Sequence, residues 1–132
     1  MLYILDTNIC IYLIKKKPLH VFEKFKTHEM GNIGISSITL AELSYGIAKS
    51  NFPEKNQKAL EKFILPLEVY EFGPDESIVY GSIRAELEKK GTPIGALDML
   101  IAAHAISRKM TLVTNNEKEF NRVAHLKIEN WI

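Results

Sequence analysis

The feature that most constrains the fold is an alternation of short apolar runs with longer amphipathic stretches along the whole chain. Runs of four or so apolar residues suit strands, and the longer stretches between them suit helices. This alternation predicts an α/β fold with a mainly parallel sheet. Strands are expected at 2–5, 32–35, 67–70, 111–114 and 126–128. Helices are expected at 8–16, 18–27, 38–49, 53–65, 75–90, 96–108 and 117–120.

Length and composition restrict the class of protein further. The chain has 132 residues, which predicts a single domain spanning 1–132, and its 46% hydrophobic residues suit a buried core. No apolar run reaches the roughly 20 residues that cross a bilayer, and the start lacks the features of a signal peptide. We therefore expect a cytoplasmic protein with no membrane partner. Cys10 is the only cysteine, so it is expected in the core rather than in a disulfide or a zinc site.

The net charge of +1 argues neither for nor against a nucleic-acid partner. Basic residues do gather near the predicted helix ends, where they stabilise the helix dipole. The same residues would steer phosphate if they surrounded an acidic site. The sequence leaves these two interpretations open. The clusters are Lys15, Lys16 and Lys17, Lys24 and Lys26, Lys89 and Lys90, and Arg108 and Lys109.

Three acids stand out because apolar residues surround them. Asp6 directly follows the first predicted strand, and Glu42 and Asp98 interrupt apolar helical stretches. Burying a lone carboxylate costs about several kcal/mol, and residues that follow parallel strands meet at one edge of the sheet. The pattern predicts a shared cation with oxygen ligands, which suits Mg²⁺ or Mn²⁺. Such an ion lowers the pKa of a bound water and favours phosphodiester hydrolysis.

Each acid also has a structural alternative. Asp6 suits an N-cap, whose side chain accepts a hydrogen bond from a backbone N–H. Thr39 and Glu42 have the spacing of a capping box, and Asp98 suits the first turn of a helix. Taken one at a time, these alternatives stay open. Three acids from three elements at one edge of a sheet favour the shared site.

The last long strand is also followed by polar residues. Thr114, Asn115 and Asn116 can form hydrogen bonds at the same edge, and either Glu117 or Glu119 can add a carboxylate. The alternative is an Asn-rich turn that caps a short helix. His104 lies six residues after Asp98, about 240° around a helix, so it is expected in the core or an interface.

Five short fragments, in the same order, match one known family over nearly the whole length. They are Leu5-Asp6-Thr7-Asn8, Ser36-Ser37-Ile38-Thr39-Leu40-Ala41-Glu42-Leu43 with Tyr45-Gly46, Gly91-Thr92-Pro93-Ile94-Gly95 with Asp98 and Ile101-Ala102-Ala103-His104-Ala105, Leu112-Val113-Thr114-Asn115-Asn116 with Glu119-Phe120, and Glu129-Asn130-Trp131. In these fragments the chain resembles the PIN-domain ribonucleases, and within them the VapC toxins of bacterial toxin–antitoxin pairs.

The resemblance implies a three-layer α/β/α fold and an Mg²⁺- or Mn²⁺-dependent endoribonuclease. It also implies a VapB antitoxin, a homodimer, and a larger complex that binds operator DNA through the antitoxin. Asp6, Glu42 and Asp98 fall on the three core acids of the family, which hold the metal. Many PIN domains have aspartate where this chain has Asn116, and Glu119 is the candidate for the fourth catalytic acid.

Five polar residues are expected to orient water, ligands or the scissile phosphate. They are Thr7, Asn8, Thr114, Asn115 and Asn116. Toxins with this Thr-Asn-Asn pattern resemble those that cut the anticodon loop of initiator tRNA, whereas other branches of the family cut ribosomal RNA.

Two rival functions are considered. One is a catalytically weak PIN module that mainly binds antitoxin or RNA, and the intact trio of acids argues against it. The other is a phosphatase of the haloacid-dehalogenase type, which expects a second acid where this chain has Asn8.

Overall fold

A computed structural model describes residues 1–132 and shows a five-stranded parallel sheet with the strand order β3-β2-β1-β4-β5. The strands are β1 (Tyr3–Leu5), β2 (Ile33–Ser36), β3 (Glu68–Tyr70), β4 (Thr111–Val113) and β5 (Ile128–Glu129). The helices are α1 (Thr7–Lys15), α2 (Leu19–Lys26), α3 (Ser37–Ala48), α4 (Pro53–Ile64), α5 (Pro74–Lys90), α6 (Ala96–Ser107) and α7 (Glu117–Phe120), with a short 3₁₀ helix at Met30–Asn32. The predicted parallel α/β fold is confirmed.

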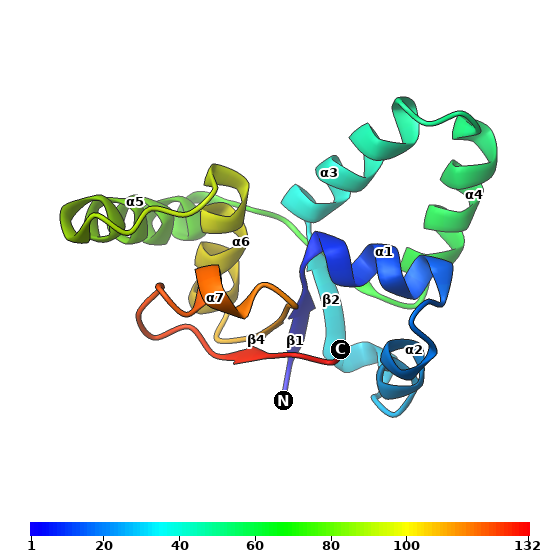
Figure 1. Cartoon of the computed structure of the whole chain (residues 1–132), viewed down its shortest axis with the longest axis horizontal. Helices are drawn as coiled ribbons and strands as arrows, with labels where there is room; N and C mark the ends of the chain where they lie inside the picture. Colours follow the sequence, from blue (N-terminus) through cyan, green and yellow to red (C-terminus); the bar gives the residue numbers. More distant parts are fainter.

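Helices cover both faces of the sheet, which gives three layers (Figure 1). The central strand β1 shows how the layers are held, because successive side chains of a strand point to opposite faces. Leu5 packs into a core cluster with residues of α1, α2, α3 and α4. Ile4 packs into a second cluster with residues of α5, α6 and α7. The two cores therefore meet at the sheet, and β1 lies between them.

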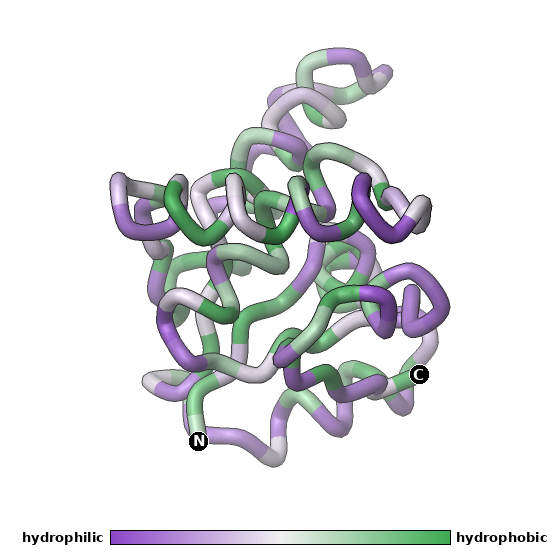
Figure 2. Tube along the Cα trace, turned by 90° about the vertical axis from the view of Figure 1, so that its left-hand side faces the viewer, coloured by the Kyte–Doolittle hydropathy of each residue, from purple (hydrophilic) through white to green (hydrophobic).

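The long helix α5 lies at the outside of one layer. Figure 2 shows hydrophilic and hydrophobic residues alternating along it, where it faces the viewer. Its buried residues are Glu76 and Leu87, and it packs against α6. Gly91 ends it in the left-handed conformation, with φ of 69°, which is typical of a glycine C-cap. The following loop leads directly into α6.

Most element boundaries agree with the predictions to within one or two residues. Two differ in a way that has a physical reason. Pro18 lies before the first turn of α2 as its N-cap, because its extended backbone, with ψ of 150°, is not helical. The last strand is shorter and later than predicted, at Ile128–Glu129, since only these residues pair with β4. None of the helices has the length and apolar character needed to cross a membrane.

Candidate active site

The four candidate acids lie at the carboxyl ends of the central strands. Asp6 follows β1, Asp98 lies in the first turn of α6, and Glu119 lies in α7, after β4. Glu42 lies in the second turn of α3, which follows β2. The charges of Glu119, Asp6 and Glu42 all contribute to raising the pKa of Asp98. The acids are therefore close enough to repel one another, as expected for one site.

Asp6 is fixed by two hydrogen bonds. Its Oδ1 accepts from the Ile9 N–H at 2.9 Å, and its Oδ2 accepts from the Thr114 hydroxyl. The first bond confirms that Asp6 is the N-cap of α1, and the second joins it to the end of β4. Burial raises the pKa of Asp6, and the charge of Glu42 adds to this, although both hydrogen bonds act in the opposite direction. A capping role and a place in the acidic cluster thus coexist.

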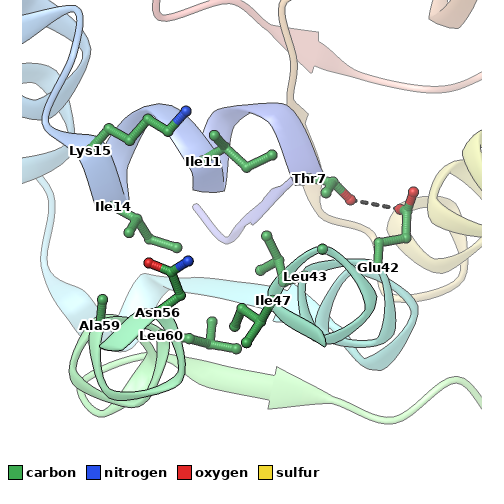
Figure 3. A pocket seen from close by; sticks show the side chains of 11 residues that line it. Thr7, Ile11, Ile14, Lys15, Glu42, Leu43, Ile47, Asn56, Ala59 and Leu60 are labelled. Carbon is green, nitrogen blue, oxygen red and sulfur yellow. Dashed lines mark hydrogen bonds between the residues drawn. The ribbon is translucent and has the colours of Figure 1, made fainter. Parts of the chain in front are cut away.

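Glu42 is held by α1. The Thr7 hydroxyl donates to Glu42 Oε1 at 2.6 Å (Figure 3). The capping-box alternative for Glu42 is wrong, because α3 begins at Ser37 and the Ser36 hydroxyl caps it by accepting from the Ile38 N–H at 3.0 Å. Glu42 is therefore free of the helix terminus and available to the site.

Asp98 and Glu119 form the other half of the cluster. Burial and the neighbouring Glu119 raise the pKa of Asp98 to about 6, with smaller effects from Asp6 and Glu42. The Asn116 amide donates to Glu119 Oε2 at 2.9 Å. Glu117 is exposed and accepts from Asn130 instead. The structure thus places Glu119 rather than Glu117 beside Asp98, and its catalytic role stays a prediction.

The structure brings three of the five predicted supporting residues to the acids. Thr7 and Thr114 bind Glu42 and Asp6, and Asn116 binds Glu119. The side chains of Asn8 and Asn115 are exposed and form no hydrogen bond with an acid. Their assignment as supporting residues has only the sequence pattern behind it.

The donor set suits a hard divalent cation. The protein's three ion pairs, Arg84–Glu88, Lys90–Glu86 and Arg108–Glu76, leave the four site acids without a basic partner. No group of three or more acidic, histidine or cysteine side chains is arranged to hold a metal alone. Mg²⁺ needs only one or two carboxylates and completes its shell with water and substrate phosphate oxygens. A cluster of acids without a basic partner, open to water and to substrate oxygens, fits that mode of binding.

Comparisons with known proteins agree with this arrangement. The sequence model described as "PIN domain" matches residues 3–126, which include all four acids. The chain belongs to the PIN-domain family. It is 49% identical to "Ribonuclease VapC2" of Rickettsia felis, with 99% of this chain and 98% of that protein covered. It is also 49% identical to "tRNA(fMet)-specific endonuclease VapC" of Salmonella typhimurium, with 98% and 97% covered.

Solved structures show the same relationship. The VapBC2 structure from Rickettsia felis, bound to a DNA fragment from its promoter, has a TM-score of 0.94 and 48% identity, with both chains fully covered. The DNA-bound VapBC structure from Salmonella typhimurium has a TM-score of 0.94 and 49% identity, again with full coverage. Within the PIN-domain family the chain therefore falls among the VapC ribonucleases.

In this PIN domain an apolar groove adjoins the acids, and the sequence analysis missed it. It has a volume of about 290 Å³ and lies between α1, α3 and α4 (Figure 3). Thr7 and Glu42 form one end, and Lys15 lines it as well. Its apolar lining is Ile11, Ile14, Leu43, Ile47, Ala59 and Leu60. Three helices that are far apart in sequence build it, so no single segment of sequence predicts it.

His104 is a core residue of the PIN domain, as predicted. It is fully buried, its Nδ1 lies 2.8 Å from Ser36 Oγ, and its Nε2 has no partner. Burial lowers its pKa, so it stays neutral near pH 7. The pair Ser36-Ser37 before an apolar helix is a sequence signal for a helix cap. The contact between Ser36 and His104 has no such signal, and the sequence analysis missed it.

Proposed function

We propose that this protein is the toxin of a toxin–antitoxin pair and that it hydrolyses RNA phosphodiester bonds with Mg²⁺ or Mn²⁺. The observation that carries the proposal is a cluster of four carboxylates without a basic partner, in which the pKa of Asp98 is raised to about 6. The relatives named as ribonucleases support the same reaction. Such an enzyme acts where its RNA is, so we propose the cytoplasm as its location.

Each acid has a proposed role. Asp6, Glu42 and Asp98 would hold the cation, and Glu119 would assist them. The bound ion would supply an activated water and neutralise charge on the phosphate. Thr114 holds the carboxylate of Asp6, and Thr7 holds that of Glu42. Neither carboxylate therefore has to be ordered when the substrate arrives.

We propose single-stranded RNA loops as the substrate, with the anticodon loop of initiator tRNA as the first candidate. Attack in line with the leaving oxygen requires flanking nucleotides that can splay apart, and A-form duplex resists this. The Salmonella relative named for tRNA(fMet) supports the choice over ribosomal RNA. Incubation with tRNA and with a perfectly paired RNA of equal length tests it. Equal cleavage of both would contradict this part of the proposal.

We propose a VapB-type antitoxin as the partner, in a complex of toxin homodimers that binds operator DNA through the antitoxin. The solved VapBC complexes on DNA support it. The groove suits an antitoxin segment with apolar residues, and an arginine at its Glu42 end would match a carboxylate with two hydrogen bonds. That arginine would replace the cation. Calorimetry should therefore find weaker Mn²⁺ binding in the complex, and unchanged binding would place inhibition elsewhere.

The catalytic proposal is tested by cleavage of total tRNA by the purified protein, in Mg²⁺ and in EDTA. Cleavage should require the cation and should be lost in Asp6→Ala. Cleavage by Asp6→Ala at the wild-type rate would contradict the site. Absence of cleavage by the wild type would favour the weak binding module.

A further inference from the structure

One aromatic side chain on the helix that carries Glu42 is largely exposed. Tyr45 is 65% exposed, three residues after Glu42 on α3. A separation of three residues is about 4.5 Å along the axis and about 60° around it. Tyr45 therefore lies about one turn nearer the C-terminal end of α3 than Glu42, on nearly the same side of the helix.

The side of α3 that carries Tyr45 is fixed by Ile38. The two residues are seven apart, which is within about 20° of two full turns, so they share one stripe. Ile38 packs against the core cluster that includes α5 and α6. Tyr45 continues this stripe beyond the covered part of α3, on the side toward the helix that carries Asp98. The groove begins at Glu42, but its apolar part lies on another side of α3, which presents Leu43 and Ile47 (Figure 3).

A lysine adds a positive charge to this surface. Lys49, one turn after Tyr45, places its Nζ 4.8 Å from the centre of the tyrosine ring. Lys49 has no ion pair with an acid. Along one side of α3 the chain thus presents a carboxylate of the site, then an exposed ring, then an unpaired positive charge.

We propose that Tyr45 is a stacking platform for a base next to the scissile phosphate and that Lys49 binds a neighbouring phosphate. This inference rests on the proposed function, since it assumes single-stranded RNA at the acids. Splayed bases of loop RNA stack on aromatic rings, and lysines beside them follow the backbone. A protein segment is a weaker fit, because Tyr45 does not line the apolar groove that suits one.

The first experiment measures binding of short single-stranded RNAs that carry 2-aminopurine at each position in turn. It is done in EDTA, and gels check that the RNA stays intact. At one position the wild type should quench the fluorescence by stacking. Tyr45→Leu should abolish this quench and raise Kd about tenfold, the scale of one stacked base. Tyr45→Phe should stay within about twofold of the wild type, because it keeps the ring.

Two further variants sharpen the result. Phe52, which is 68% exposed on the turn after α3, provides a matched control, and Phe52→Leu should leave Kd and the quench unchanged. Lys49→Gln should reduce the slope of log Kd against log salt by about one, as expected for one lost phosphate contact. In cleavage assays at saturating Mg²⁺, Tyr45→Leu should raise KM more than it lowers kcat.

Some outcomes would overturn the inference. RNA binding by Tyr45→Leu equal to that of the wild type would do so, and so would an equal loss in Phe52→Leu. Weaker antitoxin binding together with unchanged RNA binding would identify a protein interface instead. These failures are distinguishable from a failure of the proposed function, which shows as metal-independent cleavage or as cleavage retained in Asp6→Ala.

Discussion

Two carboxylates on neighbouring helices, Glu76 and Asp98, have opposite surroundings. Glu76 is 4% exposed and accepts hydrogen bonds from the Gly73 N–H at 2.9 Å and the Ser107 hydroxyl at 2.8 Å. The Arg108 guanidinium donates to it at 3.3 Å. Burial alone would raise the pKa of Glu76, but these groups outweigh it and lower the pKa to about 2. Asp98 has acids for neighbours, and its pKa rises to about 6.

The difference separates a structural carboxylate from one that is free to act. Glu76 has its charge paired inside the protein and fastens the start of α5 to the end of α6. Asp98 has no such partner, so its charge is available for a ligand from outside. A buried acid by itself indicates neither role, and the partners decide between them.

The largest expected effect is on activity. Asp98→Asn should lower kcat/KM for RNA more than about 100-fold, beyond the 10–100-fold typical of residues behind the metal ligands. Glu76→Gln, assayed well below its melting temperature, should stay within a few-fold of the wild type. Single-turnover cleavage of tRNA measures both. Similar losses in the two variants would remove the proposed distinction between the acids.

The next largest effect is on stability. Glu76→Gln should lower the free energy of unfolding at pH 7 by about 2 kcal/mol, because it leaves Arg108 without its buried partner. The neighbouring acid Asp75 is exposed and provides a control. Asp75→Asn should change the free energy of unfolding by less than about 0.5 kcal/mol. Urea titrations measure both. The stabilisation by Glu76 should be complete above pH 4.5 and decline as pH falls toward about 2, since its folded pKa is the lower one.

Asp98 should behave in the opposite way. Its folded pKa of about 6 lies above the ordinary 3.8, so its charge destabilises the metal-free protein above pH 6. Stability should be recovered as pH falls from 6 toward 3.8. Asp98→Asn should stabilise the metal-free protein at neutral pH by about 1 to 2 kcal/mol. Thermal scans in EDTA and in Mg²⁺ should show that the metal raises the melting temperature of the wild type more than that of the variant. Equal responses would mean that the acids do not share a cation.

The smallest effect distinguishes the two acids of α7. Glu119→Gln should lower the pKa of Asp98 from about 6 toward its ordinary value, because Glu119 is the charge that contributes most to raising it. Glu117→Gln should leave that pKa unchanged, since Glu117 is exposed and bonded to Asn130. NMR titration of the metal-free protein follows the carboxyl directly. A larger shift in the pKa of Asp98 in Glu117→Gln than in Glu119→Gln would contradict the choice of Glu119. So would a greater loss of activity in Glu117→Gln at limiting Mg²⁺.

Much of the fold could be predicted because local signals agree with the packing. The central strands β1 and β4 come from short, mainly apolar runs. Pro53 and Gly91 mark helix ends as local chemistry requires. The positions of Asp6 and Asp98 follow from the same signals. The local signal at Glu42 is ambiguous, because Thr39 and Glu42 match a capping box while the cap in the structure is Ser36. Two adequate caps compete there, and only packing decides between them.

Other features depend on contacts that sequence spacing does not encode. Glu76 meets Ser107 and Arg108 across more than 30 residues, and the fragment Gly73-Pro74-Asp75-Glu76 indicates only its bond to Gly73. The groove requires three helices at once. Tyr45 belongs to a family fragment, but its exposure and its contact with Lys49 depend on the three-dimensional structure.

The Ser36 hydroxyl helps to bring the acids together before any ligand binds. It ends β2, caps α3 and contacts His104 of α6, so one neutral group joins the helices that carry Glu42 and Asp98. Like charges tend to push those helices apart, and an uncharged link resists this without cancelling any charge. The protein thereby completes its negative cluster during folding. The proposed cation would then enter a field that is already oriented, and little reorganisation would remain for the reaction itself.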